Sequence, residues 1–150
     1  MGEFSPIVDH VSKFIKLTEE EEHFFVSLLR IRKLRKKQFI GQPDFITRYR
    51  SFIVSGAVRA YVIDIKGHEH TIGIAIEDWW IGDFASYIFQ TPATYFIEAL
   101  EDSIVIELEY QAEQKLLEAN PKFEKFFKKA LEQIVATLQQ RLLSSYSTAL

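Results

Sequence analysis

Residues 58–76, VRAYVIDIKGHEHTIGIAI, decide the class of fold, because apolar and polar side chains alternate along two runs on either side of Lys66-Gly67. Alternation with a period of two is typical of strands that bury one face, and a Lys-Gly pair in a polar gap favours a turn. We therefore expect a β-hairpin whose strands occupy residues 58–64 and 70–76.

The same period continues outward, from about residue 33 to residue 109. Residues 94–100 and 104–108 form a second pair of β-rich runs, separated by the polar turn Glu101-Asp102-Ser103. Glycines punctuate the region at positions 41, 56, 67 and 82. Short strands at such intervals favour a sandwich, a barrel or a jelly roll over a parallel sheet.

Helical signals flank the β region on its N-terminal side. Ser5-Pro6 predicts the N-cap and first residue of a short helix. Thr18 and Glu21 have the spacing of a capping box, which opens a second helix. The buried stripe of this second helix is expected to consist of Phe24, Phe25, Leu28 and Leu29.

On the C-terminal side, Asn120-Pro121 predicts the N-cap and first residue of a long helix that reaches about residue 144. Its apolar stripe favours pairing with a second copy, so we expect a homodimer; the alternative is that the stripe packs on its own β-domain. Arg141 at a seam position predicts that the packing weakens toward the end of the helix. The expected dimer-helix residues are Phe127, Leu131, Ile134, Val135, Leu138 and Leu142.

The composition indicates one folded domain over residues 1–150. The chain is 47% hydrophobic and 14% aromatic, and it has no Cys. These values exclude a disordered chain, a disulfide scaffold, a Cys-ligated zinc site and an iron–sulfur cluster. No apolar run is long enough for a membrane span, and the first residues lack the pattern of a signal peptide. We therefore expect a cytoplasmic protein without a membrane partner.

The net charge of −3 suggests no particular partner, but residues 30–37 hold six Lys and Arg residues. Such a window could meet a phosphate group. The favoured interpretation is a solvated helix end that runs into a strand, with Ile31 and Leu34 turned inward.

A possible metal site lies at His68-Glu69-His70, where two imidazoles share one face of a predicted strand. Cupin enzymes are similar in having a jelly roll with this H-x-H pattern, but here the next carboxylate, Glu77, follows only after six intervening residues. A solvated pair beside the turn is the favoured interpretation. The chain also lacks a nucleophile elbow and a P-loop. The sequence therefore predicts no enzyme and no metal, with a cupin-like metal-dependent enzyme as an alternative.

The most informative segments are WWIGDFASY at residues 79–87 and PATYFIEA at residues 92–99. They resemble the phosphate-binding cassette of the cyclic-nucleotide-binding domains in Crp/Fnr transcription regulators. The resemblance extends along the whole chain, including a glycine turn at residues 55–59 and Asn120-Pro121 before a long helix. It implies an α+β fold: an antiparallel β jelly roll (double-stranded β-helix) flanked by short N-terminal helices and a long C-terminal dimerisation helix.

The resemblance also implies a ligand site. In the family, amides at a short helix start and an Arg bind the phosphate, and a carboxylate binds the ribose. Here Asp83 stands for the family Glu, Thr94 for a Ser and Ala93 for the phosphate-binding Arg, while Leu138 and Gln139 align with adenine-contacting hydroxyls. The ligand-binding candidates are Gly82, Asp83, Phe84, Ala85, Thr94 and Tyr95.

Without the Arg, a desolvated phosphate would lose a charge-assisted bond of about 2 kcal/mol. The departures therefore weigh against cyclic AMP, and no cofactor is predicted with certainty. A less charged ligand is one alternative. The other is a cavity filled by aromatic side chains, for which the candidates are Phe84, Tyr87, Tyr95 and Phe96.

The function implied is that of a sensory and dimerisation module of a Crp/Fnr-like transcription regulator. A small-molecule effector would change the packing of the helix pair and thereby reorient a DNA-binding domain. No basic recognition helix follows residue 144, so DNA would be contacted only through a domain that this sequence does not contain. A ligand-independent dimerisation scaffold is the alternative.

Overall fold

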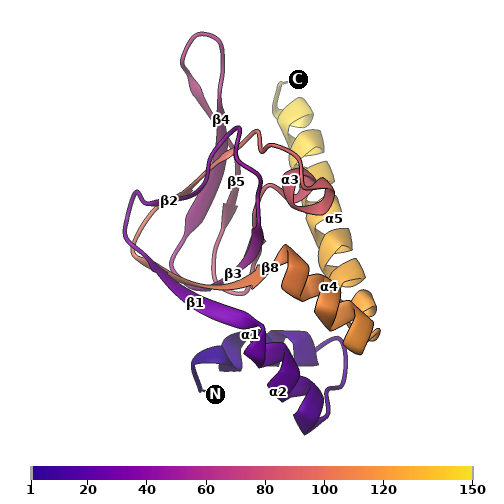
Figure 1. Cartoon of the computed structure of the whole chain (residues 1–150). Coiled ribbons are helices and arrows are strands. Elements are labelled where there is room, and N and C mark those ends of the chain that lie inside the picture. Colours follow the sequence, from indigo (N-terminus) through magenta and orange to yellow (C-terminus); the bar gives the residue numbers. More distant parts are fainter. Residues whose placement is uncertain (1, 150) are drawn as a thin grey trace.

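The computed structural model describes residues 2–149, with side chains as far as Tyr146. It consists of a β-roll with helices at one end and along one side (Figure 1). The elements in chain order are η1 (Gly2–Phe4), α1 (Ser5–Ser12), α2 (Glu19–Ser27), β1 (Leu29–Leu34), β2 (Phe39–Gly41), β3 (Tyr49–Ser55), β4 (Val58–Ile63), β5 (Glu69–Ala75), β6 (Trp80–Ile81), α3 (Phe84–Phe89), β7 (Phe96–Ala99), β8 (Ser103–Glu109), α4 (Tyr110–Ala119) and α5 (Phe123–Ala149).

The strands form two antiparallel sheets of four strands each, in the orders β1-β8-β3-β6 and β2-β7-β4-β5. The fold is therefore the predicted α+β jelly roll. The hairpin from the opening stretch is confirmed, since β4 pairs antiparallel with β5 from Val58–Ala75 to Ile63–Glu69. Between Ala60 and Tyr61 the register skips Ile72 on the partner strand, which marks a bulge in β5.

The second pair of β-rich runs is divided between the sheets. β7 pairs with β2 and β4, whereas β8 pairs with β1 and β3. The chain thus crosses from one sheet to the other after β7, and it also crosses between β3 and β4. The two crossings meet at Gly56 and Ser103, because the Ser103 hydroxyl accepts a hydrogen bond of 3.2 Å from the amide of Ala57.

The apolar core has two parts. One lies between the first sheet and the helices and includes Phe25, Phe52, Leu116, Phe123 and Phe126. The other lies inside the β-roll, and its buried members are Leu34, Ile53, Val58, Ala60, Ala75, Ile81, Ile97, Ala99 and Val105. The alternating strands supply both parts, because neighbouring residues on a strand face opposite sides of the sheet.

The N-terminal boundaries differ in detail from expectation. The capping box is confirmed: Thr18 Oγ1 accepts from the Glu21 amide at 3.2 Å, and Glu21 accepts from the Thr18 amide at 2.8 Å. In α1, however, Phe4 occupies the N-cap position and Ser5 is already helical. α2 ends at Ser27, so Leu29 opens a strand instead of extending the helical stripe.

The basic window is therefore mostly strand rather than a helix end. Arg30 and Arg32 project from β1 toward Glu107 on β8, with nitrogen–oxygen distances of 2.9 and 3.6 Å. Strand pairing places Arg30 directly opposite Glu107. Two of the six cations thus stabilise the first sheet by cross-strand pairing.

The C-terminal helix begins later and ends later than expected. Asn120 is the C-cap of α4, and α5 runs over Phe123–Ala149, a length of about 40 Å. It passes along the side of the roll, next to α3 (Figure 1). Within the described part of the chain, no helix combines the length and apolar character needed to cross a membrane.

We predict that Gly56→Ala destabilises the chain far more than Gly67→Ala. Both glycines have positive φ, at 100° and 88°, which costs an L-residue about 1–2 kcal/mol. A Cβ at Gly56 would also lie 2.6 Å from Ser103 Cβ and 2.8 Å from its Cα, whereas a Cβ at Gly67 has nothing within 4 Å. Urea unfolding of both variants measures the difference, and equal losses would contradict the assigned crossing.

Candidate ligand-binding site

Residues 80–89 form a short strand, a turn and a one-and-a-half-turn helix, from β6 to α3. Asp83 is the N-cap of α3, and its side chain accepts a 3.1 Å hydrogen bond from the Ser86 amide. Its other oxygen accepts from the Thr94 amide at 2.8 Å and from the Thr94 hydroxyl at 3.3 Å. Asp83 as a residue is only 3% exposed. Asp83 and Thr94 are therefore brought together, but Thr94 hydrogen-bonds to the Asp83 carboxylate, which does not face solvent.

A cavity of about 310 Å³ lies between β5, the β6–α3 turn and α5. Five of the six ligand-binding candidates line it: Gly82, Asp83, Phe84, Ala85 and Tyr95. Thr94 is not in the lining and reaches the site only through Asp83. The wall from α5 consists of Leu131, Ile134, Val135, Thr137, Leu138 and Arg141. The cavity thus touches the cassette and the long helix at once.

Aromatic side chains do not fill this cavity. Phe84 and Tyr95 form part of its wall, but the other two candidates point elsewhere. Tyr87 is 1% exposed and donates a hydrogen bond to Glu113. Phe96 stacks on Tyr61 with 5.2 Å between the ring centroids.

The position that aligns with the phosphate-binding Arg offers no cation. Ala93 is 5% exposed and does not line the cavity. Its amide donates to the Phe45 carbonyl at 2.8 Å, and its carbonyl accepts from the Asp44 amide at 2.9 Å. On α5, Leu138 lines the cavity and Gln139 does not. The groups that would bind the phosphate and the base of a cyclic nucleotide are therefore missing from these positions.

Sequence reasoning missed the cation that does line the cavity, Arg141. Its Nη1 donates a 2.9 Å hydrogen bond to the carbonyl of Ile72 on β5, so the side chain reaches across to the roll. It was expected to weaken a helix seam. The sequence spacing could have placed Arg141 at the cavity. Arg141 follows Ile134 by seven residues, which is about two helical turns, and both lie on the side of α5 that faces the cavity.

The cavity wall also contains a buried donor without a partner. Trp80 is 8% exposed, and its indole N–H has no hydrogen-bond acceptor among the described residues. A buried donor left unpaired costs about 1–3 kcal/mol. Because the indole nitrogen is itself buried, Trp80 does not offer this donor to the cavity, whose wall is mostly apolar.

The apolar stripe of α5 changes character along its length. Phe127 is 9% exposed and packs under the Arg50 guanidinium, 4.5 Å from ring centroid to Cζ, so it belongs to the core of its own chain. Ile134 is half-buried beside the cavity. The remaining predicted dimer-helix residues are 43–59% exposed: Leu131, Val135, Leu138 and Leu142. The chain's own roll therefore does not cover this part of the stripe.

The paired histidines have a structural role in the hairpin. Asp64 accepts from the amides of Lys66 and His68, and its carboxylate lies 2.7 Å from Nε2 of His70. The His70 hydrogen bond, followed by that from the His68 amide, lowers the pKa of Asp64. Among the side chains described, those of residues 2–146, no set of three or more His, Asp or Glu is placed to hold a metal ion.

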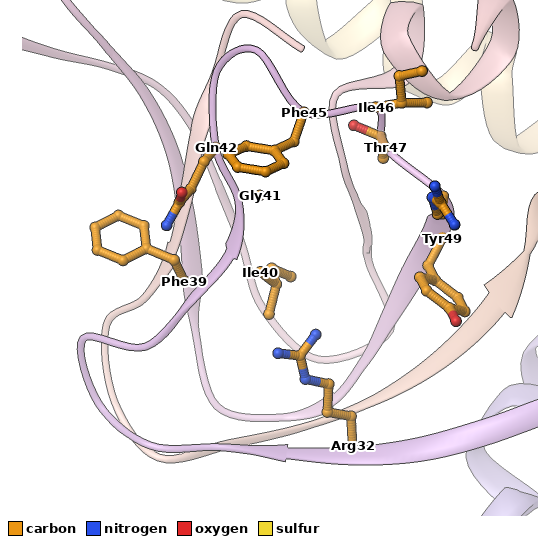
Figure 2. Close-up of a pocket in the computed structure, with 10 residues that line it drawn as sticks. Arg32, Phe39, Ile40, Gly41, Gln42, Phe45, Ile46, Thr47 and Tyr49 are labelled. Atoms are coloured by element: carbon orange, nitrogen blue, oxygen red, sulfur yellow. The ribbon is translucent and has the colours of Figure 1, made fainter. Parts of the chain in front are cut away.

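A second cavity, of about 320 Å³, lies away from the cassette (Figure 2). It opens beside β2 and the loop that leads into β3, with Arg32 at one edge and Tyr49 at another. None of the ligand-binding candidates or α5 residues lines it. It therefore cannot link a bound molecule to the long helix.

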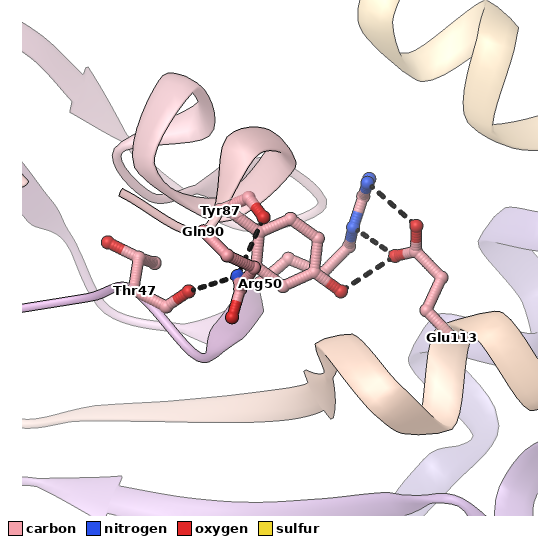
Figure 3. A network of polar contacts seen from close by, with 5 residues as sticks. All are labelled: Thr47, Arg50, Tyr87, Gln90 and Glu113. Carbon is pink, nitrogen blue, oxygen red and sulfur yellow. Dashed lines mark hydrogen bonds and ion pairs between the residues drawn. The ribbon is translucent and has the colours of Figure 1, made fainter. Parts of the chain in front are cut away.

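A buried polar network fixes α3 to the helices around it (Figure 3). Arg50 on β3 forms an ion pair with Glu113 on α4, with Nε and Oε1 2.7 Å apart. The hydroxyl of Tyr87 on α3 donates to the same carboxylate oxygen at 2.8 Å. Burial, and after it the adjacent Glu113 charge, raises the pKa of Tyr87 far above its ordinary value. Gln90 closes the C-terminal end of α3 by donating to the Tyr87 and Thr47 carbonyls.

We predict that Glu113→Ala lowers the free energy of unfolding by about 3–5 kcal/mol, because it leaves the Arg50 charge buried without a partner. Tyr87→Phe keeps the ion pair and removes one hydrogen bond, for an expected loss of about 1 kcal/mol. Urea unfolding of the two variants gives the comparison. A loss below that of Tyr87→Phe would show that the ion pair does not hold the helices together.

Comparison with known proteins agrees with this fold. Residues 31–120 match the family model of the cyclic nucleotide-binding domain. A cyclic nucleotide-binding domain from Methylobacillus flagellatus superposes with a TM-score of 0.82 at 18% identity, covering 96% of this chain and 84% of that one. The catabolite activator protein of Thermus thermophilus gives a TM-score of 0.72 at 20% identity, over 90% of this chain. The chain spans only 63% of that protein's length.

The sensor domain of the transcriptional regulator DNR from Pseudomonas aeruginosa superposes with a TM-score of 0.63 at 14% identity, covering 92% of this chain and 86% of that one. A sequence search among curated proteins returned no significant match. The fold is thus the one found in Crp/Fnr regulators such as the catabolite activator protein. Because the family match covers more than half of its length, the chain belongs to the cyclic nucleotide-binding domain family.

Proposed function

We propose that this chain is the effector-binding and dimerisation module of a Crp/Fnr-like transcription regulator, acting in the cytoplasm and catalysing no reaction. The observation that carries the proposal is the position of the cavity between the cassette and α5. A molecule bound there contacts the roll and the long helix together. Its binding energy can therefore favour one position of the helix over another.

The two halves of α5 are held differently. The first half is anchored in the core, where Phe123, Phe126 and Ala130 are 0%, 1% and 7% exposed. From Leu131 onward, α5 borders this cavity and two neighbouring cavities, one beside His10 and Phe14 and one beside Phe84 and Ile88, and Arg141 donates its hydrogen bond to β5. We infer that an effector acts on this second half, which would rotate or shift about the anchored first half.

A second copy of this chain is the proposed occupant of the exposed stripe. Leu131 and Leu138 lie seven residues apart, as do Val135 and Leu142, which is the repeat of a two-helix seam. Three of these residues, Leu131, Val135 and Leu138, also line the cavity. The same side chains would thus meet the effector and the partner helix, which couples ligand binding to the packing of the dimer.

The DNA-binding step is proposed to belong to a separate domain that the dimer helices orient. The effector is proposed not to be a cyclic nucleotide. The ribose-binding carboxylate of Asp83 is already used by Ser86 and Thr94, and Ala93 provides no charge for a phosphate. A ligand-independent scaffold remains the competing function, and the tests below separate it from an effector-binding module.

For the dimer, we predict that Leu142→Asp converts the chain to a monomer in a sizing experiment at micromolar concentration. Leu142 is 59% exposed and lies outside the cavity, so the substitution places a charge in the seam and leaves the ligand site intact. Gln140→Asp puts the same charge on another exposed face of α5 and should stay dimeric. A wild-type chain that is monomeric, or a dimer that Leu142→Asp does not dissociate, would refute the proposed dimer interface.

For the ligand, we predict that millimolar cyclic AMP and cyclic GMP leave the melting temperature unchanged. A ligand present at 100 times its Kd adds about 2.7 kcal/mol of stability, which a thermal-shift titration detects easily. A saturable shift would contradict the proposal against cyclic nucleotides. For the true effector, hydrogen exchange along α5 should slow on binding; equal protection with and without it would favour the ligand-independent scaffold.

A further inference from the structure

The walls of the cavity at α5 restrict the chemistry of the effector, and this step rests on the function proposed above. We infer that the effector is a predominantly apolar molecule with a single negative charge, of the kind of a medium-chain or aromatic carboxylate, and that Arg141 binds the charge. The family site takes its anion at the cassette. Here the anion would instead be held from the opposite wall, by the long helix.

The charges in the lining favour an anion. Asp83 and Arg141 are the two charged residues among the residues that line the cavity. Both oxygens of Asp83 already accept hydrogen bonds from Ser86 or Thr94, so this carboxylate has little to offer a ligand. A neutral ligand that covered the Arg141 guanidinium would remove water from an uncompensated charge, whereas a carboxylate would pair with it.

The geometry leaves the guanidinium able to bind a second acceptor. Arginine has five N–H donors in a planar fork, and the described hydrogen bond to the Ile72 carbonyl uses one of them. The side chain lies against Gly73, where an added Cβ would be 2.8 Å from Nη1. The bare backbone at Gly73 therefore makes room for the guanidinium at the edge of the cavity. Among the side chains of residues 2–146, no carboxylate lies within ion-pair distance of Arg141.

The rest of the wall matches an apolar body. Its side chains are largely aliphatic or aromatic, with Ile72, Ile74, Trp79, Ile81, Phe84, Leu131, Ile134 and Leu138 among them. The volume of about 310 Å³ lies at the small end of the range for ligand pockets. A carboxylate on Arg141 would add a bridge between α5 and β5 beside the existing hydrogen bond. The charge of the effector would thus fix the half of the helix that is least anchored.

The test uses decanoate as the anionic probe and decanamide as its uncharged match, with calorimetry and thermal shift on the whole chain. We expect decanoate to bind saturably and decanamide to bind more weakly. Arg141→Gln should lower the affinity for decanoate by about tenfold or more and leave the affinity for decanamide unchanged. The reason is that only the anion forms a charge-assisted hydrogen bond that the substitution can remove.

Two further variants separate binding from folding. Lys129→Gln removes an exposed cation from the same helix and should bind decanoate like the wild type. Gly73→Ala keeps the Arg141 charge but displaces the guanidinium. It should therefore lower the affinity for decanoate, as Arg141→Gln does. Circular dichroism and sizing confirm that each variant is folded and dimeric before its affinity is compared.

Three results with decanoate and decanamide alone would overturn the inference. They are equal binding of decanoate and decanamide, an Arg141→Gln variant with unchanged preference, and no binding of either probe by a folded dimer. Each leaves the proposed sensory and dimerisation function standing, because that function fails on different results: a wild-type chain that is monomeric, or a dimer that Leu142→Asp does not dissociate. Displacement of decanoate by cyclic AMP would refute the apolar class of ligand and restore the nucleotide.

Discussion

The buried ion pair between Arg50 and Glu113 is the contact around which the helices of this domain are arranged. It joins the first sheet to α4, receives the Tyr87 hydroxyl from α3 and lies against Phe127 at the base of α5. Two charges taken out of water are tolerated only when they are paired and hydrogen-bonded. This requirement gives α3, α4 and the start of α5 fixed positions relative to the roll. It also explains why Phe127 belongs to the core and not to a dimer seam.

The consequence is a helix with a rigid beginning and a weakly held continuation. Aromatic packing secures α5 as far as Ala130, and beyond it the helix borders a cavity and exposes leucines. A weakly held element is where a small amount of binding energy can change a population. A ligand that bridges the roll and the second half of α5 would act on the part of the molecule that is easiest to move. The anchored half would keep the motion local.

Asp83 illustrates how a family pattern can be retained while its chemistry changes. Its oxygens cap α3 and hold the Thr94 segment in place, which are structural tasks inside the cassette. A shorter carboxylate that is buried and already accepts three hydrogen bonds is poorly presented to a ribose. The cassette therefore shapes one wall of the cavity. The charge that a ligand would meet lies on the opposite wall, at Arg141.

The sequence by itself determined the β-hairpin, the capping box and the long helix, because strand alternation, N-cap chemistry and helical spacing are local patterns. The choice of a jelly roll over a sandwich or a barrel came from the family resemblance. It also placed Gly82, Asp83, Phe84, Ala85 and Tyr95 near a ligand cavity, through the family pattern of the cassette. Only the tertiary structure decided that Leu29 begins a strand, that Phe127 is core and that Arg141 reaches β5. These outcomes depend on which surfaces meet after folding. A periodic stripe gives the spacing of apolar residues but not the partner that covers each of them, and Arg141 meets Ile72 only because α5 lies along the roll.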